Sequence, residues 1–323
     1  MMKSKVQKEI PLFSVITAAY RAKPFLHRYF QTLSNQTICD FEVILSIRFD
    51  SSEEKNSISK IIHKESEILK TKSVDIRILE DDKNLGQGAA RNQAAELAKG
   101  KYLAILDVDD EWSPEKLELS LECFQKNPDI DVVFHDKVLC NINGKEKNDC
   151  WTGRPITHRL LLFEDNKISN SASVMRTSKF RELEGFDETL REREDWDFWM
   201  RAAKENMVFF HLPQILLKYH VHGSNLHLNN IERNRNYMLK IFHQHFEMRF
   251  PKKLMDRFRY FRMRSMLNRV IVSHHLRNEN FLEAFEEVFF CTLWWPFGWK
   301  NYGYLTLITL SLIKRSIRKL KFV

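Results

Sequence analysis

Glycine and proline are scarce in this sequence, with 9 and 8 residues among 323, which excludes collagen-like and low-complexity chains. The five cysteines are scattered and lack C-x-x-C spacing, which argues against a disulfide framework or a zinc site and favours a reducing compartment. The first residues, MMKSKVQKEIPLF, lack the apolar stretch of a signal peptide, so we expect a cytoplasmic chain.

The remaining composition is typical of a globular protein, with 43% hydrophobic, 12% aromatic and 29% charged residues. The length suggests one large domain or two modest ones. The net charge of +8 is uneven, because residues 230–323 carry 18 Lys and Arg against 7 Asp and Glu, whereas residues 1–229 are slightly acidic. A basic segment of this kind is typical of proteins that bind nucleic acid or an anionic membrane.

Hydrophobic patterning predicts alternating strands and helices up to residue 134. Strands are expected at 12–19, 41–47, 74–79, 102–106 and 130–134, and helices after Pro24 and over 55–70, 88–99 and 114–125. Gly100 is expected to end the third helix, and Ser113 is expected to cap the fourth. This alternation predicts an α/β fold with a mostly parallel sheet that helices cover on both faces.

Polar residues cluster where these strands end. In open sheets of this kind, ligands bind beyond the carboxyl ends of the strands. Tyr20 and Arg21 follow the first strand, and residues 48–52, 84–91 and 107–110 follow the second, third and fourth. We therefore expect a binding site at this edge of the sheet.

Three carboxylates, Asp107, Asp109 and Asp110, directly follow the fourth strand. They repel one another unless a cation or hydrogen-bond donors compensate them, and a divalent ion on a phosphorylated ligand would do so. Mg²⁺ or Mn²⁺ suits such oxygen ligands. The alternative is a solvated acidic turn before the N-terminus of a helix.

The segment NLGQGAARN, residues 84–92, contains G-x-G between a strand and a helix, as in dinucleotide-binding loops. Arg91 occupies the position where such a loop needs a small residue, and the segment follows the third strand instead of the first. A helix N-terminus, or Arg91 itself, beside a phosphate group is the better interpretation.

A second acidic pattern, REREDWDFWM, covers residues 191–200. Trp196, Trp199 and Met200 have the spacing of the inner face of a helix, with Glu194 and Asp195 at its start. Acidic residues also occur as ordinary caps at a helix N-terminus, because the helix dipole favours them there.

Together these segments resemble the family 2 inverting glycosyltransferases of the GT-A fold. The resemblance extends over about residues 10–225 and rests on six segments in the family's order: FSVITAAYR, EVILSIRFDSS, NLGQGAARNQA, KYLAILDVDDEWSPEKLE, GFDE and REREDWDFWMRA. It implies metal-dependent transfer of a sugar, with inversion, from a donor linked to UDP, GDP or dTDP to a hydroxyl of a glycan or lipid-linked acceptor. It also implies a part in bacterial cell-surface polysaccharide synthesis.

The resemblance also implies roles for single residues. Asp195 would be the general base, Asp109 and His222 would hold Mn²⁺ or Mg²⁺, and Asp110 would be a stand-in for Asp107 or Asp109. The residues implied in nucleotide-sugar binding are Ala18, Tyr20, Asp50, Asn84, Arg91, Asp107 and Glu194.

The sequence departs from the family after its second strand. The family commonly has an acidic D-D-G-S there that reads the nucleotide base, whereas this chain has IRFDSS at residues 47–52. Asp50 takes that role only if the loop is shifted, and Arg48 adds a cation beside the nucleotide pocket. A catalytically silent nucleotide- or membrane-binding protein of the same fold is therefore the alternative. A nucleotidyltransferase would have a glycine-rich loop after its first strand, which TAAYRAKPF lacks.

The last 30 residues combine three tryptophans at 294, 295 and 299 with the apolar run Leu305–Ile313 and basic residues behind it. The run is shorter than the roughly 20 residues that span a bilayer. The pattern favours an interfacial anchor on the inner leaflet of an anionic membrane, and a helix packed on the catalytic domain is the alternative.

Aromatic residues between arginines in residues 233–269 can also indicate nucleic acid, but no RNA or DNA module is recognisable, and we expect no nucleic-acid partner. We therefore expect a nucleotide-sugar-binding and catalytic GT-A domain in residues 1–229. A helical basic region in residues 230–323 would follow it, peripheral on the cytoplasmic face of the membrane.

Overall fold

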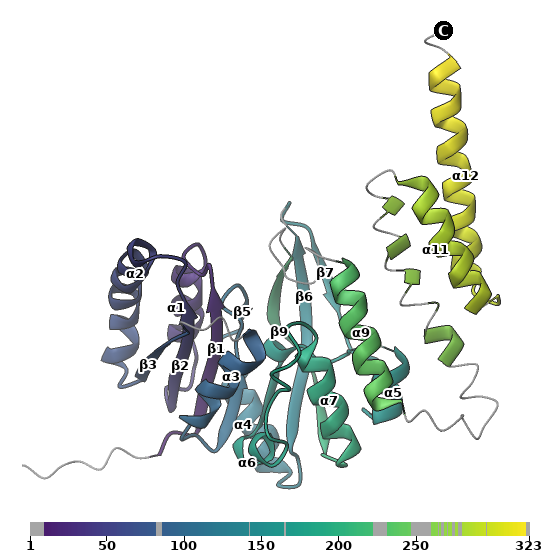
Figure 1. Ribbon diagram of the computed structural model, residues 1–323. Coiled ribbons are helices and arrows are strands. Elements are labelled where there is room, and N and C mark those ends of the chain that lie inside the picture. The colour runs from purple at the N-terminus through teal and green to yellow at the C-terminus, as the bar shows by residue number, and fades with distance from the viewer. Residues whose placement is uncertain are drawn as a thin grey trace, which may run out of the picture. The chain divides into compact units, whose positions relative to one another are not determined.

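The computed structural model describes residues 10–81, 86–141, 143–164, 166–221, 231–246, 260–263, 265, 268–269, 271–272, 275–276, 280–294 and 296–320. The chain divides into two compact units, one of Met1–Leu161 and Asn166–His222, the other of Leu162–Asp165 and Gly223–Val323. A single sheet runs through the first unit in the order β3-β2-β1-β4-β8-β6-β9-β5, and β7 pairs with β6 (Figure 1).

The first half of the sheet is parallel. β1 (Phe13–Tyr20) lies between β2 (Phe41–Arg48) and β4 (Tyr102–Ile105), and β3 (Asp75–Glu80) pairs with β2. The connecting helices are α1 (Leu26–Ser34), α2 (Ser52–Thr71) and α3 (Gln87–Glu96). The predicted alternation of strands and helices is confirmed here, and the carboxyl ends of these strands meet at one edge.

The second half of the sheet is mixed. β8 (Ser173–Arg176) is antiparallel to β4 and to β6 (Val132–Asn141), β9 (Phe209–Val221) is parallel to β6, and β5 (Glu111–Trp112) and β7 (Glu146–Asp149) are antiparallel additions. The helical segments in this part of the chain are α4 (Lys116–Lys126), α5 (His158–Glu164), the 3₁₀ turn η1 (Asn170–Ala172), α6 (Thr177–Glu182) and α7 (Glu194–Lys204). The strand expected at 130–134 is thus the start of a longer one.

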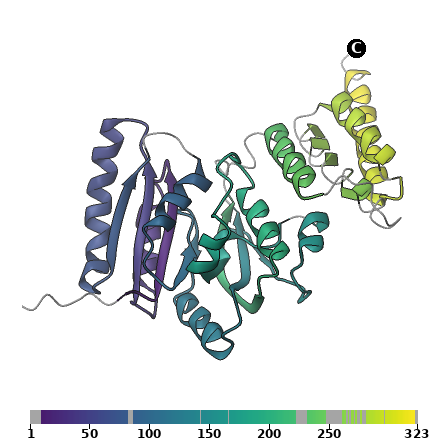
Figure 2. The ribbon, with the colours of Figure 1, turned by 60° about the horizontal axis from the view of Figure 1, so that its bottom comes forward.

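Side chains of the central strands are buried on both faces of the sheet. Val15 and Val43 pack in one core with residues of α1, α2 and α4. Their neighbours Ile16 and Ile44 are also buried, and α3 packs against β1 and β2. Figure 2 shows α2 and α3 on opposite sides of this part of the sheet. Burial on both faces explains why these strands are continuous apolar runs and confirms the predicted layers.

Two predicted helix boundaries are wrong. α3 ends at Glu96, so Gly100 does not terminate it. Gly100 is required instead by close packing, because a Cβ there would lie 2.5 Å from the backbone of β1 at Phe13. α4 begins at Lys116 without a side-chain cap, and the N–H of Ser113 donates to the carbonyl of Leu216.

The second unit contains α9 (Ile231–His245), α11 (Phe281–Trp294) and α12 (Trp299–Leu320). α11 and α12 pack against each other as a hairpin. Met238 and Phe242 of α9 are buried, which confirms that aromatic and methionine side chains of this basic region form a core. Among the described residues, no helix is long and apolar enough to cross a membrane. All five cysteines are free thiols, as the sequence predicts.

Candidate active site

The turn after β4, residues 106–110, carries the D-x-D sequence and is fixed by two hydrogen bonds. Thr17 Oγ1 of β1 donates to the carbonyl of Leu106 over 2.7 Å. The N–H of Asp107 donates to Ser171 Oγ of η1 over 3.0 Å. Since Thr17 and Ser171 are buried, the D-x-D turn is held at the edge where β1 and β4 end.

Arg91 of α3 joins the D-x-D turn to α7. Its Nη2 lies 2.5 Å from Asp107 Oδ1, and its Nη1 lies 2.5 Å from Glu194 Oε1. Arg91 is 2% exposed and Glu194 is 1% exposed. A buried guanidinium needs compensating carboxylates, and these two supply them. Three elements that are distant in the chain are thereby tied together at one point.

Glu194 has a second partner and an altered acidity. Its Oε2 accepts a hydrogen bond from Gln87 Nε2 over 3.0 Å. Burial raises the pKa of Glu194 to about 7, although the charge of Arg91 opposes the rise. Burial therefore makes the Glu194 carboxyl easier to protonate than an exposed glutamate.

Asp195 lies beside this cluster in the first turn of α7. Its Oδ2 accepts a hydrogen bond from Asn166 Nδ2 over 2.7 Å, and its Oδ1 accepts the N–H of Trp196 over 2.8 Å. Burial raises the pKa of Asp195, and the charges of Arg193 and Arg91 oppose the rise. The side chain remains partly exposed to solvent. A half-buried carboxyl of raised pKa is suited to accept a proton from a bound hydroxyl.

The aromatic side of α7 anchors the helix that presents Asp195. Trp196, Trp199 and Met200 are fully buried, which confirms their prediction as the inner face of a helix. The indole Nε1 of Trp196 donates to the carbonyl of Leu161 over 2.9 Å. Such an anchored helix keeps the neighbouring carboxylates in place.

The other two acids of the D-x-D turn differ in exposure. Asp109 is partly exposed, and its carbonyl accepts a hydrogen bond from Arg28 Nη2 over 2.7 Å. Asp110 is buried beneath the turn, where its Oδ1 accepts the N–H of His220 over 3.3 Å. Burial, together with the neighbouring carboxylates of Asp109 and Asp107, raises the pKa of Asp110 well above its ordinary value. Asp110 therefore faces the protein interior, unlike Asp109.

Lys116 lies buried under the D-x-D turn, a position that the sequence pattern does not single out. Its Nζ donates to the carbonyl of Ser171 over 2.9 Å and lies 3.5 Å from the ring centroid of Trp112. Burial lowers the pKa of Lys116 well below its ordinary value, and the charge of Asp110 opposes the shift. In sequence, Lys116 begins an amphipathic helix and resembles a solvated lysine, so only the fold shows its role.

A second cluster lies where β1 and β2 end. Tyr20 Oη donates to Asp50 Oδ2 over 3.2 Å, and Arg21 Nε lies 3.3 Å from the same oxygen. The Arg48 guanidinium lies 5.0 Å from the ring centroid of Tyr20. Ala18 is two residues before the end of β1 and is partly exposed. The structure thus brings Ala18, Tyr20 and Asp50 to the edge of the sheet that carries the D-x-D turn.

Two predicted site residues, Asn84 and His222, lie outside the described residues. Two residues before His222, His220 of β9 is described, and its Nε2 lies 2.6 Å from Glu111 Oε1. Within the described part of the chain, no group of three or more His, Cys, Asp or Glu side chains is arranged to hold a metal ion. Asp107 and Asp109 are carboxylates at this edge of the sheet, and their oxygens are suited to bind a metal ion.

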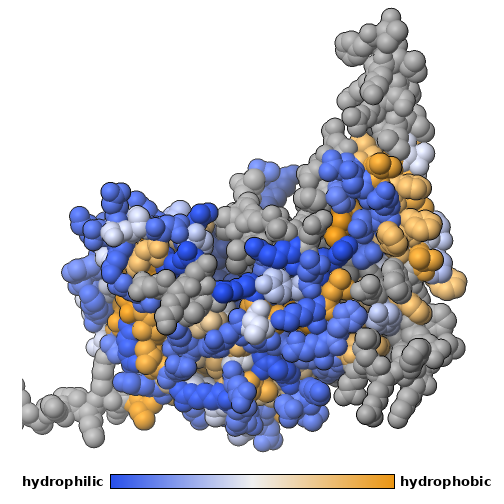
Figure 3. Space-filling view, in the orientation of Figure 1, coloured by the Kyte–Doolittle hydropathy of each residue, from blue (hydrophilic) through white to orange (hydrophobic). Residues whose placement is uncertain are grey.

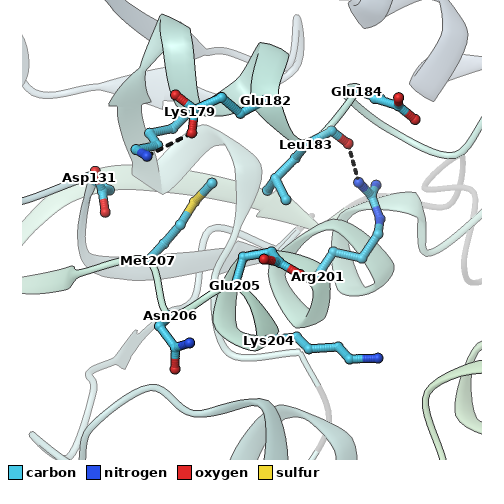
Figure 4. Close-up of a pocket in the computed structure, with 10 residues that line it drawn as sticks. All are labelled: Asp131, Lys179, Glu182, Leu183, Glu184, Arg201, Lys204, Glu205, Asn206 and Met207. Carbon is cyan, nitrogen blue, oxygen red and sulfur yellow. Dashed lines mark hydrogen bonds and ion pairs between the residues drawn. The ribbon is translucent and has the colours of Figure 1, made fainter.

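A hollow of about 560 Å³ lies at the other end of α7, lined by residues of α6, α7 and the segment before β9 (Figure 4). In it Lys179 Nζ contacts Glu182, and Arg201 donates to the carbonyl of Leu183. None of the predicted site residues lines this hollow. α7 begins at Glu194 and ends at Lys204, so the hollow is separated from Asp195 by the length of the helix.

Comparison with solved structures shows the same fold at low sequence identity. The chain is similar to S. aureus TarS in complex with UDP-GlcNAc, with a TM-score of 0.56 and 15% identity over 87% of this chain and 91% of that one. It is also similar to the mannosyltransferase PcManGT from Pyrobaculum calidifontis in complex with GDP-Man and Mn²⁺, with a TM-score of 0.52 and 13% identity over 96% and 76%.

Sequence comparison finds relatives of similar length. An uncharacterised glycosyltransferase of Methanocaldococcus jannaschii is 29% identical over 70% of this chain and 77% of its own. The amylovoran biosynthesis glycosyltransferase AmsB of Erwinia amylovora is 25% identical over 65% and 69%. The family model described as glycosyl transferase family 2 matches residues 14–184, which is more than half of the chain. This protein, with its GT-A-like sheet and its D-x-D turn, belongs to glycosyl transferase family 2.

Proposed function

We propose that this enzyme transfers a sugar from a nucleotide-sugar donor to a hydroxyl of a glycan or lipid-linked acceptor, with inversion at the anomeric carbon, in bacterial cell-surface polysaccharide synthesis. The observation that carries the proposal is the link through Arg91 between Asp107, on the D-x-D turn, and the first turn of α7 with Asp195. Donor sugars on UDP and GDP in the similar structures, and the amylovoran relative, support the substrate class.

The donor would bind in residues 1–229, across the carboxyl ends of β1, β2 and β4. Asp107 would contact the ribose, and the cluster of Tyr20 and Asp50 would flank the base, with Ala18 beneath it. Both Nη atoms of Arg91 contact carboxylates, so Arg91 would hold Asp107 and Glu194 in position. Asn84, which precedes α3 in sequence, is proposed to border the donor.

A divalent metal fits the donor set at this edge. Mg²⁺ and Mn²⁺ are commonly held by one or two carboxylates together with substrate phosphates. Asp109, with Asp107 beside it and with His222, would supply the protein's share of the metal ligands. When bound, the metal would stabilise the negative charge that develops on the departing diphosphate.

Asp195 would perform the proton transfer. The acceptor hydroxyl would attack the anomeric carbon on the face opposite the diphosphate, a new carbon–oxygen bond would form, and the bond to the phosphate oxygen would break. The hydroxyl proton would pass to Asp195, while Asn166 holds Oδ2 of that carboxylate in place. The nucleoside diphosphate would leave with the bonding electron pair, and attack on the opposite face would invert the anomeric centre.

The second region, residues 230–323, is proposed to attach the enzyme peripherally to the cytoplasmic face of the membrane. Its excess of Lys and Arg supports contact with an anionic inner leaflet. The attached enzyme would then be close to a lipid-linked acceptor, which lies in the membrane.

Thermal unfolding with ligands tests the proposed function. UDP, GDP and dTDP are each added with and without Mn²⁺, because a ligand that binds only the native state raises the midpoint. A metal-dependent rise with one nucleotide is expected. No rise with any of them would favour the catalytically silent alternative, and a rise without transfer to any acceptor would favour a nucleotide-binding protein.

A further inference from the structure

We infer that the exposed apolar face of α11 is the surface through which the second unit enters an anionic lipid bilayer. This inference rests on the membrane attachment proposed above and names the residues that carry it. It does not depend on catalysis, because the surface lies entirely on the α11–α12 hairpin.

Four apolar residues form a stripe on α11. Leu282, Phe285, Phe289 and Leu293 recur at intervals of three or four residues, which places them on one face of the helix. Their exposed fractions lie between 49% and 70%. Figure 3 shows apolar side chains gathered over α11 on the visible face. Large apolar side chains in such a row are unusual on a soluble surface and mark an interaction site.

The opposite face of α11 is used for packing. Ala284, Val288 and Cys291 are fully buried and form a small core with Ile308 of α12. Ile308 belongs to the apolar run Leu305–Ile313, so part of that run is buried between α11 and α12. The predicted anchor in α12 therefore cannot present its whole apolar run to lipid, and the stripe of α11 supplies a further apolar face.

Two further exposed aromatic residues lie at the hairpin turn and at the start of α12. Phe297, between α11 and α12, is 73% exposed, and Tyr302 is exposed at the start of α12 with its Oη donating to the carbonyl of Pro296. Aromatic side chains with a polar end are typical of the membrane–water interface. A helix that lies in the membrane–water interface buries such an apolar stripe at the level of the headgroups.

The positive charge of residues 230–323 favours an anionic bilayer as the binding partner of this surface. Residues 230–323 carry 18 Lys and Arg against 7 Asp and Glu. Basic residues near a membrane surface favour anionic lipids, and their contribution is screened by salt. Another copy of this basic region would be repelled by the same charge, so self-association is disfavoured. Two exposed acids on α11, Glu283 and Glu286, lie beside the stripe and offer a test of the electrostatic contribution.

The experiment measures binding of the full chain to vesicles of 70% phosphatidylcholine and 30% phosphatidylglycerol, with vesicles of phosphatidylcholine alone for comparison. The test variant combines Phe285→Gln and Phe289→Gln, which keep the helix and remove two apolar side chains. The matched control is Ile68→Gln on α2, a helical apolar residue that is 56% exposed in the first unit. Circular dichroism confirms that each variant is folded.

We expect the intact chain to bind the anionic vesicles, with weaker binding in 0.5 M than in about 0.1 M salt. The double variant should lose about 100-fold or more in partition coefficient, because two aromatic side chains that would be buried in the bilayer are removed. Ile68→Gln should bind as the intact chain does, and Glu286→Gln should bind at least as well. A double variant that binds as tightly as the intact chain would overturn the α11 surface while leaving membrane attachment standing.

Two other results would also overturn the inference. If the intact chain binds neither kind of vesicle, membrane attachment itself fails. If the intact chain elutes as a dimer and the double variant as a monomer, the stripe is a contact between copies. Nucleotide-dependent stabilisation, measured on the same samples, reports on the proposed transferase function separately.

Discussion

Arg91 and Glu194, 103 residues apart in the chain, form a buried ion pair with 2.5 Å between Nη1 and Oε1. The pair links α3 to α7, in which Asp195 directly follows Glu194. Because Arg91 also holds Asp107, the donor side and the base side of the proposed reaction share one buried cation. Its loss would affect folding and geometry together.

Replacing Arg91 by Met should destabilise the fold by about 3–5 kcal/mol, because two carboxylates would lose their buried partner. Arg91→Lys should recover only part of the lost stability. Lysine restores the positive charge, but a single ammonium cannot make the forked contact with both carboxylates. Urea denaturation measures both. Lys126→Met, which removes an exposed partner of Glu122, is the control and should leave the midpoint nearly unchanged. Equal stability of Arg91→Met and the intact chain would contradict a structural role for Arg91.

The raised pKa of Glu194 predicts a pH dependence of stability. The folded-state value of about 7 lies above the ordinary 4.5, so between these values the folded protein holds more protons than the unfolded chain. The contribution of Glu194 is therefore fully present below about pH 4.5 and is lost as the pH rises to 7. Melting curves between pH 5 and 8 should fall less steeply for Glu194→Gln than for the intact chain. Parallel pH profiles would show that Glu194 titrates normally.

Asn166 should tune the acidity of Asp195. A hydrogen bond to a carboxylate favours its charged form, so Asn166→Ala should raise the pKa of Asp195 further. If Asp195 is the base, the acid limb of the kcat/KM profile should move to higher pH in this variant. Asn143→Ala, in an exposed turn, is the control. A loss of rate at every pH, without a shift of the limb, would assign Asn166 to packing instead.

Two glycines should respond to alanine with opposite signs. Gly100→Ala places a Cβ 2.5 Å from the backbone of β1, so we expect a loss of about 3 kcal/mol or more. Gly303→Ala lies within α12 with open space around the new methyl group, and should stabilise that helix by about 0.5–1 kcal/mol. Thermal unfolding distinguishes the two. A neutral Gly100→Ala would mean that β1 and the segment before β4 can separate at little cost.

The parallel half of the sheet could be predicted from the sequence because its strands are buried on both faces. Val43 and Ile44 face opposite helical layers, and both are buried. A short, continuous apolar run between two predicted helices is typical of a strand buried on both faces of a parallel sheet. Helix ends were harder: Gly100 has the composition of a C-cap but serves strand packing, and Ser113 precedes a proline as a cap would but bonds to β9.

Within the site, the acidic residues could be located but their partners could not. Asp107 and Glu194 lie far apart in the sequence, with most of the second half of the sheet between them. Nothing in the local sequence predicts that Arg91 bridges them. Lys116 has the sequence context of a surface lysine, yet it is buried against Trp112 under the D-x-D turn. Contacts between distant segments are set by the tertiary fold, which the local pattern does not encode.

The exchange Asp195→Asn tests the proposed mechanism most directly. It keeps the shape of the side chain and removes its ability to accept the acceptor's proton. We expect kcat for sugar transfer to fall by about 10³-fold, within the range for lost general base catalysis, while the midpoint rise given by nucleotide and Mn²⁺ is retained. The exposed Asp129→Asn is the control and should transfer at the normal rate. Near-normal transfer by Asp195→Asn would contradict the role of Asp195 as the base.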